Sequence, residues 1–123
     1  MSKKVTIKWL AKPAATNFPS ALSYLTLLYD KRTAGALVRK LKRARTTPFK
    51  SKDIFRASGL SLLGVSNTHV ERDEKKIKAG AKLSPLLLVR DPQCRRVLVA
   101  DGYHRLCAVY SHDEDAVIPC RIV

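Results

Sequence analysis

Apolar residues recur along this chain in two different patterns. In residues 19–29 and 31–45 they return every three or four positions, which predicts two amphipathic helices joined by a short loop, an antiparallel helical hairpin. At 86–89 and 97–100 they form short unbroken runs, which are typical of buried strands. The first half of the chain is therefore expected to be mainly helical, and the second half to contain a sheet.

The apolar positions of the two helices define the faces that we expect to be buried. They are Leu22, Leu25, Leu28 and Tyr29 in the first helix, and Ala34, Leu37, Val38, Leu41 and Ala44 in the second. The opposite face of the second helix is almost purely cationic, with Arg39, Lys40, Lys42, Arg43 and, at its margin, Arg45.

Shorter elements fill the remaining segments. Thr46-Thr47-Pro48 is expected to break the second helix, and Ser51 to cap a helix over 52–58 that Gly59 ends. The other predicted elements are strands at 5–7, 60–65 and 118–123, a turn at 66–68, a helix at 73–79 ending at Gly80, a turn at 91–93 and a helix at 105–111.

The fold class predicted from this order is α+β, a small mixed sheet with helices. We expect a basic, mainly helical segment at 1–58 packed on a core formed by 59–123. The chain of 123 residues fits one domain.

Charge is distributed unevenly along the chain. Residues 1–52 hold 13 Lys and Arg against one acid, a net charge of +12, whereas residues 53–123 hold 11 against nine, a net charge of +2. Such a basic half favours a polyanionic partner such as DNA, RNA or a membrane surface. The alternative is that the cationic helix face is only a solvated surface.

Cysteine usage and hydropathy bear on where the protein functions. Cys94, Cys107 and Cys120 are an odd number without paired spacing, which favours reduced thiols over disulfides or a zinc site. No apolar run is long enough for a membrane span or a signal peptide. We therefore expect a cytoplasmic protein without a membrane partner and with no bound structural metal.

The densest chemical signal is the turn Asp101-Gly102-Tyr103-His104-Arg105, which follows a predicted buried strand and opens a helix. Gly102 permits a sharp turn, and the first turn of a helix leaves N–H groups free to bind an anion. His104 and Arg105 add donors where the helix dipole already favours negative charge. This pattern predicts a phosphate site at the turn.

The turn and its surroundings resemble the ParB/sulfiredoxin superfamily, in which a strand enters a G-x-x-R turn that opens a helix. The helix is followed here by Ile118-Pro119, as in sulfiredoxins, and preceded upstream by Asp73-Glu74-Lys75-Lys76-Ile77, which matches their D-x-x-K-V helix start. Pro85-Leu86-Leu87-Leu88-Val89 after Gly80 is similar to a ParB strand. The resemblance covers about residues 60–123 and implies the fold of a small bacterial ParB-like protein.

The resemblance implies roles for particular residues. His104 and Arg105 would hold nucleotide phosphates, of ATP or CTP, with Mg²⁺ allowed, and Lys76 would assist. Tyr103 stands where sulfiredoxins have their cysteine nucleophile and ParB proteins a glutamate. A phenol cannot replace a low-pKa thiolate, so peroxiredoxin repair is not expected.

Three residues near the turn have open roles. Asp101 is either a general base or magnesium ligand, or it caps the following helix. His69 is either a second candidate base that reaches the site or a structural residue. Tyr103 is either an active group or a packed ring with its hydroxyl satisfied.

The leading functional hypothesis is a phosphate- or nucleotide-binding ParB-like domain that contacts DNA through its basic helix. The alternatives are a small phosphotransferase, nuclease or nucleotidase of the same fold, and a non-enzymatic interaction protein. The sequence leaves open whether the protein is an enzyme and what its oligomeric state is.

Overall fold

The computed structural model describes residues 6–63 and 67–123, and it is a small mixed α+β protein. Its main sheet has the strand order β2-β6-β4-β5, with β2 (Thr46–Lys50), β4 (Leu86–Asp91), β5 (Arg96–Asp101) and β6 (Val117–Ile122). β6 runs parallel to β4 and antiparallel to β2, and β4 runs antiparallel to β5. A separate parallel pair joins β1 (Lys8–Trp9) to β3 (Lys82–Leu83).

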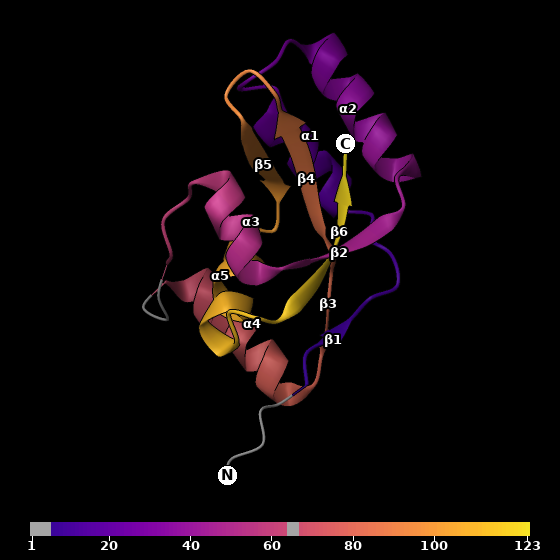
Figure 1. Cartoon of the computed structure of the whole chain (residues 1–123). Coiled ribbons are helices and arrows are strands. Elements are labelled where there is room, and N and C mark those ends of the chain that lie inside the picture. Colours follow the sequence, from indigo (N-terminus) through magenta and orange to yellow (C-terminus); the bar gives the residue numbers. More distant parts are fainter. Residues whose placement is uncertain (1–5, 64–66) are drawn as a thin grey trace.

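Helices cover both faces of the main sheet (Figure 1). On one face, α1 (Asn17–Leu25) and α2 (Lys31–Arg43) pack over Leu87 and Val89 of β4. On the other face, α3 (Ser51–Ser58), α4 (Thr68–Ala79) and α5 (Tyr103–His112) pack with Leu86 and Leu88. Consecutive residues of β4 thus pack into the hydrophobic cores on opposite faces of the sheet, which explains why the run 86–89 is apolar at every position.

The two buried clusters account for most predicted core positions. Leu25, Ala34, Val38 and Leu41 are buried between the α1–α2 pair and the sheet, as predicted. Leu28 was expected on the same buried face but is 52% exposed, because α1 ends at Leu25 and the chain turns before it. The helix also begins at Asn17, two residues before the predicted start, so that Pro19 lies in its first turn.

Several predicted elements agree with the structure. The strands at 86–89, 97–100 and 118–123 are β4, β5 and β6. Gly59 and Gly80 end α3 and α4 in left-handed conformations, with φ of +66° and +74°. The turn predicted at 91–93 joins β4 to β5.

Other predicted elements are wrong. Residues 60–63 lie in no strand, and the rest of the predicted strand at 60–65 lies outside the described residues. Thr6 and Ile7 are not in a strand, whereas Lys8–Trp9 are, and Val5 lies outside the described residues. Ser51 does not cap α3: it is buried inside the first turn, and its hydroxyl donates to the carbonyl oxygen of Glu114 at 2.7 Å.

The segment 46–50 breaks the second helix as predicted but forms a strand, β2, which sequence analysis missed. β2 pairs with β6 along its whole length, so residues 46–58 share the sheet and its core with the C-terminal part of the chain. Arg121 of β6 also donates through Nη1 to the carbonyl oxygen of Lys42 at 2.7 Å and to that of Leu41 at 3.3 Å. A cation at these C-terminal carbonyls fits the dipole of α2 and ties the helix to the sheet.

No helix within residues 6–63 and 67–123 is long and apolar enough to cross a membrane.

Candidate functional site

The turn between β5 and α5 is shaped by Gly102, whose φ of +106° is a conformation that residues with a side chain rarely adopt. A Cβ at this position would overlap the Cδ2 atom of Leu86, which is fully buried, and would lie 2.8 Å from Nη2 of Arg105. Glycine is therefore required both by the backbone and by the space. The tight turn brings the first N–H groups of α5 directly after the strand.

Arg105 is held by the residue that ends β5. Its Nη2 donates to Oδ2 of Asp101 at 2.8 Å and to the carbonyl oxygen of Pro85 at 3.4 Å. The two side chains are only 17% and 12% exposed, and Nε of Arg105 is buried without a hydrogen-bond partner. Asp101 does not cap α5, whose N-cap residue is Gly102 without a side-chain hydrogen bond. Asp101 thus positions the guanidinium of Arg105.

A pocket of about 200 Å³ lies at this turn. Basic and imidazole side chains dominate its lining; together with Gly102 and Tyr103 the lining consists of His69, Arg72, Asp73, Lys76, Asp101, His104 and Arg105. The pocket therefore brings together all the predicted phosphate-site residues, namely Gly102, Tyr103, His104, Arg105 and Lys76, along with His69 and Asp101. The four contributions from α4 are spaced at 69, 72, 73 and 76, which places them on one face of a helix.

Sequence analysis missed Arg72 and Asp73 as members of this pocket. The helix was expected to begin at residue 73, whereas it begins at Thr68 behind the N-cap Asn67, whose Oδ1 accepts from the N–H groups of His69 and Val70. Extending the predicted helix back to Asn67 would have shown the shared face. The signal was the Asn67-Thr68 pair, which is a typical helix start.

The two histidines of the pocket lie against each other. The rings of His69 and His104 are 4.7 Å apart between centroids. Burial lowers the pKa of His104 below its usual 6.5, and the neighbouring His69 lowers it further. The imidazole of His104 is therefore mainly neutral at pH 7 in the free protein, and a bound anion would favour its charged form.

Asp73 is the most buried acid of the pocket, with 8% of its surface exposed. Burial raises the pKa of its carboxyl, while the charges of Lys76 and Arg105 oppose that shift. Nζ of Lys76 lies 4.0 Å from Oδ1 of Asp73, a loose ion pair that leaves the 51%-exposed lysine side chain available to a ligand.

Tyr103 lines the pocket, and its hydroxyl is hydrogen-bonded. Its hydroxyl donates to the carbonyl oxygen of Ser61, and burial raises its pKa above the usual 10.0. A satisfied phenol that holds its proton fits the packed alternative for this residue better than the active one.

The cysteine nearest the turn, Cys107, is a buried thiol. Cys107 is buried one helical turn along α5, its Sγ accepts from the N–H of Leu63 at 3.5 Å, and burial raises the pKa of its thiol. Burial raises the pKa of the Cys120 thiol to about 12, and Cys94 is exposed. All three are free thiols, and among the described residues no group of three or more His, Cys, Asp or Glu side chains is placed to hold a metal ion.

The cationic face of α2 is a second candidate surface. Arg39, Lys40, Lys42 and Arg43 of α2, and Arg45 two residues beyond its end, are all exposed. None of them forms an ion pair with an acid in the part of the chain that the structure describes. The helix lies on the opposite face of the sheet from α4 and α5, at the other end of the molecule (Figure 1). The structure thus separates the basic helix from the pocket at the turn.

Comparison with protein-family models, with curated proteins and with solved structures finds no match for this chain.

Proposed function

We propose that the pocket at the N-terminus of α5 binds a phosphate group carried by a nucleotide. The observation that supports it most is the convergence of Arg72 and Lys76 from α4 with His104 and Arg105 from α5 on free N–H groups of a helix start. Cations at a helix N-terminus are unfavourable by themselves, because the dipole is positive there. An anion removes that repulsion and accepts hydrogen bonds from the side chains and the backbone together.

The acids of the pocket leave it cationic. Asp101 neutralises Arg105, and Asp73 partly neutralises Lys76, while Arg72 has no acidic partner among the described residues. His104 adds charge when it is protonated. A dianionic phosphate therefore gains from protonation of His104 as well as from the fixed cations.

A nucleotide is the proposed carrier on the ParB/sulfiredoxin-like interpretation of this part of the chain. The order of strand, glycine turn, helix and Ile118-Pro119 strand supports that interpretation, as does the position of Lys76 on the helix that faces the turn. ATP and CTP are the candidates that the resemblance implies.

The arrangement favours binding over phosphotransfer or hydrolysis. The carboxylate of Asp101, the first candidate base, accepts a hydrogen bond from Arg105 at 2.8 Å and is nearly buried. The same contact does not fit Asp101 as a magnesium ligand, since a cation there would lie beside the guanidinium. His69, the second candidate base, is exposed beside His104 and forms no ion pair with a carboxylate among the described residues.

A thermal-shift screen tests the proposed site. The full chain is melted with ATP, ADP, CTP, GTP and inorganic phosphate, with and without Mg²⁺. A ligand at about 100 times its Kd should stabilise the wild type by about 2.7 kcal/mol. Lys76→Gln should lose most of that stabilisation, whereas Lys78→Gln, an equal charge change on the same helix outside the pocket, should keep it. Equal loss in both variants would show a general charge effect instead.

We also propose that the exposed cationic face of α2 contacts DNA. The observation that favours it is the group of five exposed cations that form no ion pair with an acid among the described residues. They lie in and just after the last turns of α2, where the helix dipole stabilises positive charge. Such a face neutralises phosphates without reading sequence. The surface lies apart from the nucleotide pocket, so the two binding events are expected to be independent.

Removing three of these charges should weaken DNA binding and its dependence on salt. For Arg39→Gln/Lys42→Gln/Arg43→Gln we expect the slope of log K against log salt to decrease in magnitude by about 2–3, because each lost duplex phosphate contact removes about 0.9. The control is Lys12→Gln/Lys78→Gln/Lys82→Gln, which removes the same charge from exposed positions outside α2. Fluorescence anisotropy with a short duplex measures both, and an equal change of slope in the control would contradict the role of α2.

A further inference from the structure

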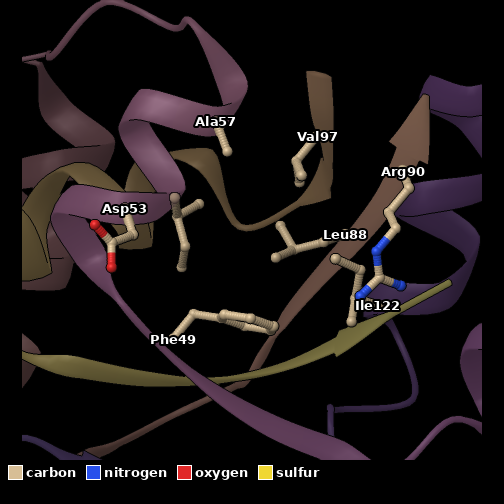
Figure 2. Close-up of a pocket in the computed structure, with 8 residues that line it drawn as sticks. Phe49, Asp53, Ala57, Leu88, Arg90, Val97 and Ile122 are labelled. Atoms are coloured by element: carbon tan, nitrogen blue, oxygen red, sulfur yellow. The ribbon is translucent and has the colours of Figure 1, made fainter. Parts of the chain in front are cut away.

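A second pocket, of about 220 Å³, lies between α3 and the sheet face that it covers (Figure 2). It shares no residue with the pocket at the turn. Its apolar lining comes from α3 and all four strands of the main sheet, and consists of Phe49, Ile54, Ala57, Leu88, Val97 and Ile122. An apolar cavity of about 150 Å³ is large enough for benzene. This pocket therefore has room for one aromatic ring or branched aliphatic group.

Charged residues of opposite sign flank the apolar lining. Figure 2 shows Arg90 on the β4 side of the pocket and Asp53 on the α3 side, at opposite ends. The carboxylate of Asp53 lies 3.5 Å from Nη1 of Arg56 and is directed away from the apolar side chains. The guanidinium of Arg90 lies beside Ile122 and has no ion-pair partner among the described residues.

The Arg90 end continues into an adjoining hollow. This hollow shares Ala57, Arg90 and Val97 with the pocket and adds Arg95 and Arg96. Its one acid, Asp91, accepts a hydrogen bond from the N–H of Cys94 at 3.4 Å. The three arginines therefore give one end of the apolar pocket an excess of positive charge, while the other end carries Asp53.

We propose that this pocket binds a small carboxylic acid with an aromatic or branched aliphatic body. The body is removed from water against the apolar lining, which supplies the non-directional part of the affinity. The carboxylate lies at the Arg90 end, where a guanidinium can donate two parallel hydrogen bonds to it. Asp53 repels a carboxylate at the opposite end, so the charge distribution fixes the orientation of the ligand.

Three probes with one apolar body and different charges test the proposal: 3-phenylpropionate, 3-phenylpropionamide and 3-phenylpropylamine. Each is titrated into the full chain while the methyl resonances of Ile54, Leu88, Val97 and Ile122 are followed by NMR. We expect the carboxylate to bind about tenfold more tightly than the amide, since a hydrogen bond to a charged group is worth at least that factor. The amine should bind most weakly, and saturating inorganic phosphate should displace none of them.

Two variants distinguish the contribution of the Arg90 charge to ligand binding from that of the apolar pocket. Arg90→Gln should reduce the preference for the carboxylate over the amide to about onefold and leave the affinity for the amide unchanged. Ala57→Leu should weaken binding of all three probes, because the added side chain points into the pocket. Lys78→Gln, an exposed cation on α4 that does not line this pocket, should change neither. Absence of binding, equal affinity for the three probes, or shifts confined to methyl groups elsewhere would each overturn the proposal.

Discussion

The Gly102→Ala variant is expected to melt roughly 10 °C below the wild type. The added Cβ would overlap the buried side chain of Leu86, and the φ of +106° would be strained for any residue with a side chain. Backbone strain and overpacking each cost about 1–3 kcal/mol, which gives a loss of about 3 kcal/mol in the free energy of unfolding. For a domain of this size, that loss corresponds to the expected shift in Tm.

The matched control for Gly102 is Gly35→Ala in the interior of α2. There the new Cβ would meet only Nη1 of Arg39, at 3.4 Å, and the helical conformation suits alanine. We expect this variant to gain about 0.5–1 kcal/mol, because glycine is the poorer helix former. Differential scanning calorimetry of both variants is the measurement. A Gly102→Ala protein as stable as the wild type would contradict the tight turn that shapes the anion pocket.

Breaking the pair between Asp101 and Arg105 is expected to have the second largest effect. Arg105→Gln leaves a carboxylate that is only 12% exposed without its charged partner. Removing one member of a buried pair costs about 3–5 kcal/mol, and the remaining exposure of this pair places the expected loss near 3 kcal/mol. Asp101→Asn, which leaves the guanidinium with the carbonyl of Pro85, should also be destabilised.

A double-mutant cycle isolates the interaction between these two side chains. Asp101→Asn/Arg105→Gln should be more stable than the sum of the single losses predicts, with a coupling of about 1–3 kcal/mol from urea unfolding curves. The two variants should also differ in ligand binding: Arg105→Gln should abolish phosphate binding, whereas Asp101→Asn should only weaken it, because the guanidinium keeps its charge but loses the carboxylate that positions it. Phosphate binding that is unchanged or stronger in Asp101→Asn would contradict the positioning role that we assign to Asp101.

The sequence predicted the part of the fold in which local pattern and tertiary packing agree. The unbroken apolar runs at 86–89 and 97–100 are strands because both faces of the sheet are covered, so every position in them meets a core. The role of Gly102 in a tight turn could be predicted, because a glycine between a buried strand and a helix start typically permits such a turn. The α+β class and the three C-terminal strands followed from these signals.

The secondary-structure predictions were wrong where strand pairing or solvent exposure, rather than local sequence, determines the structure. Pro48 indicated a break, yet it lies in β2 at the edge of the sheet, where its missing N–H does not interrupt an inner ladder. Leu60 and Leu62 suggested a strand, yet they are 41% and 48% exposed and pair with no neighbour among the described residues. No local pattern reports which strand an apolar segment will pair with, so such segments are ambiguous from sequence.

The candidate site was predictable in its chemistry but not in its full membership. His104, Arg105 and Lys76 were expected together, and the structure brings them to one pocket with His69. Arg72 was missed because the start of α4 was placed too late, and Asp73, although inside the predicted helix, was not assigned to the site. The Asp101–Arg105 contact was also missed, because Asp101 was considered only as a general base, a magnesium ligand or a helix cap. Residues four apart across a helix start meet only if the turn is as tight as Gly102 allows.

The most direct test of the central claim is the pKa of His104, followed by NMR of its imidazole ring with and without saturating phosphate or nucleotide. In the free protein we expect a pKa below 6.5, because burial and His69 disfavour the charged ring. A phosphate bound at the start of α5 lies beside the ring and favours its charged form, so the pKa should rise on binding. The amide resonances of His104 and Arg105 should shift with the same saturation. A pKa of His104 that does not change while the ligand is bound elsewhere on the protein, or no binding at all, would contradict the account.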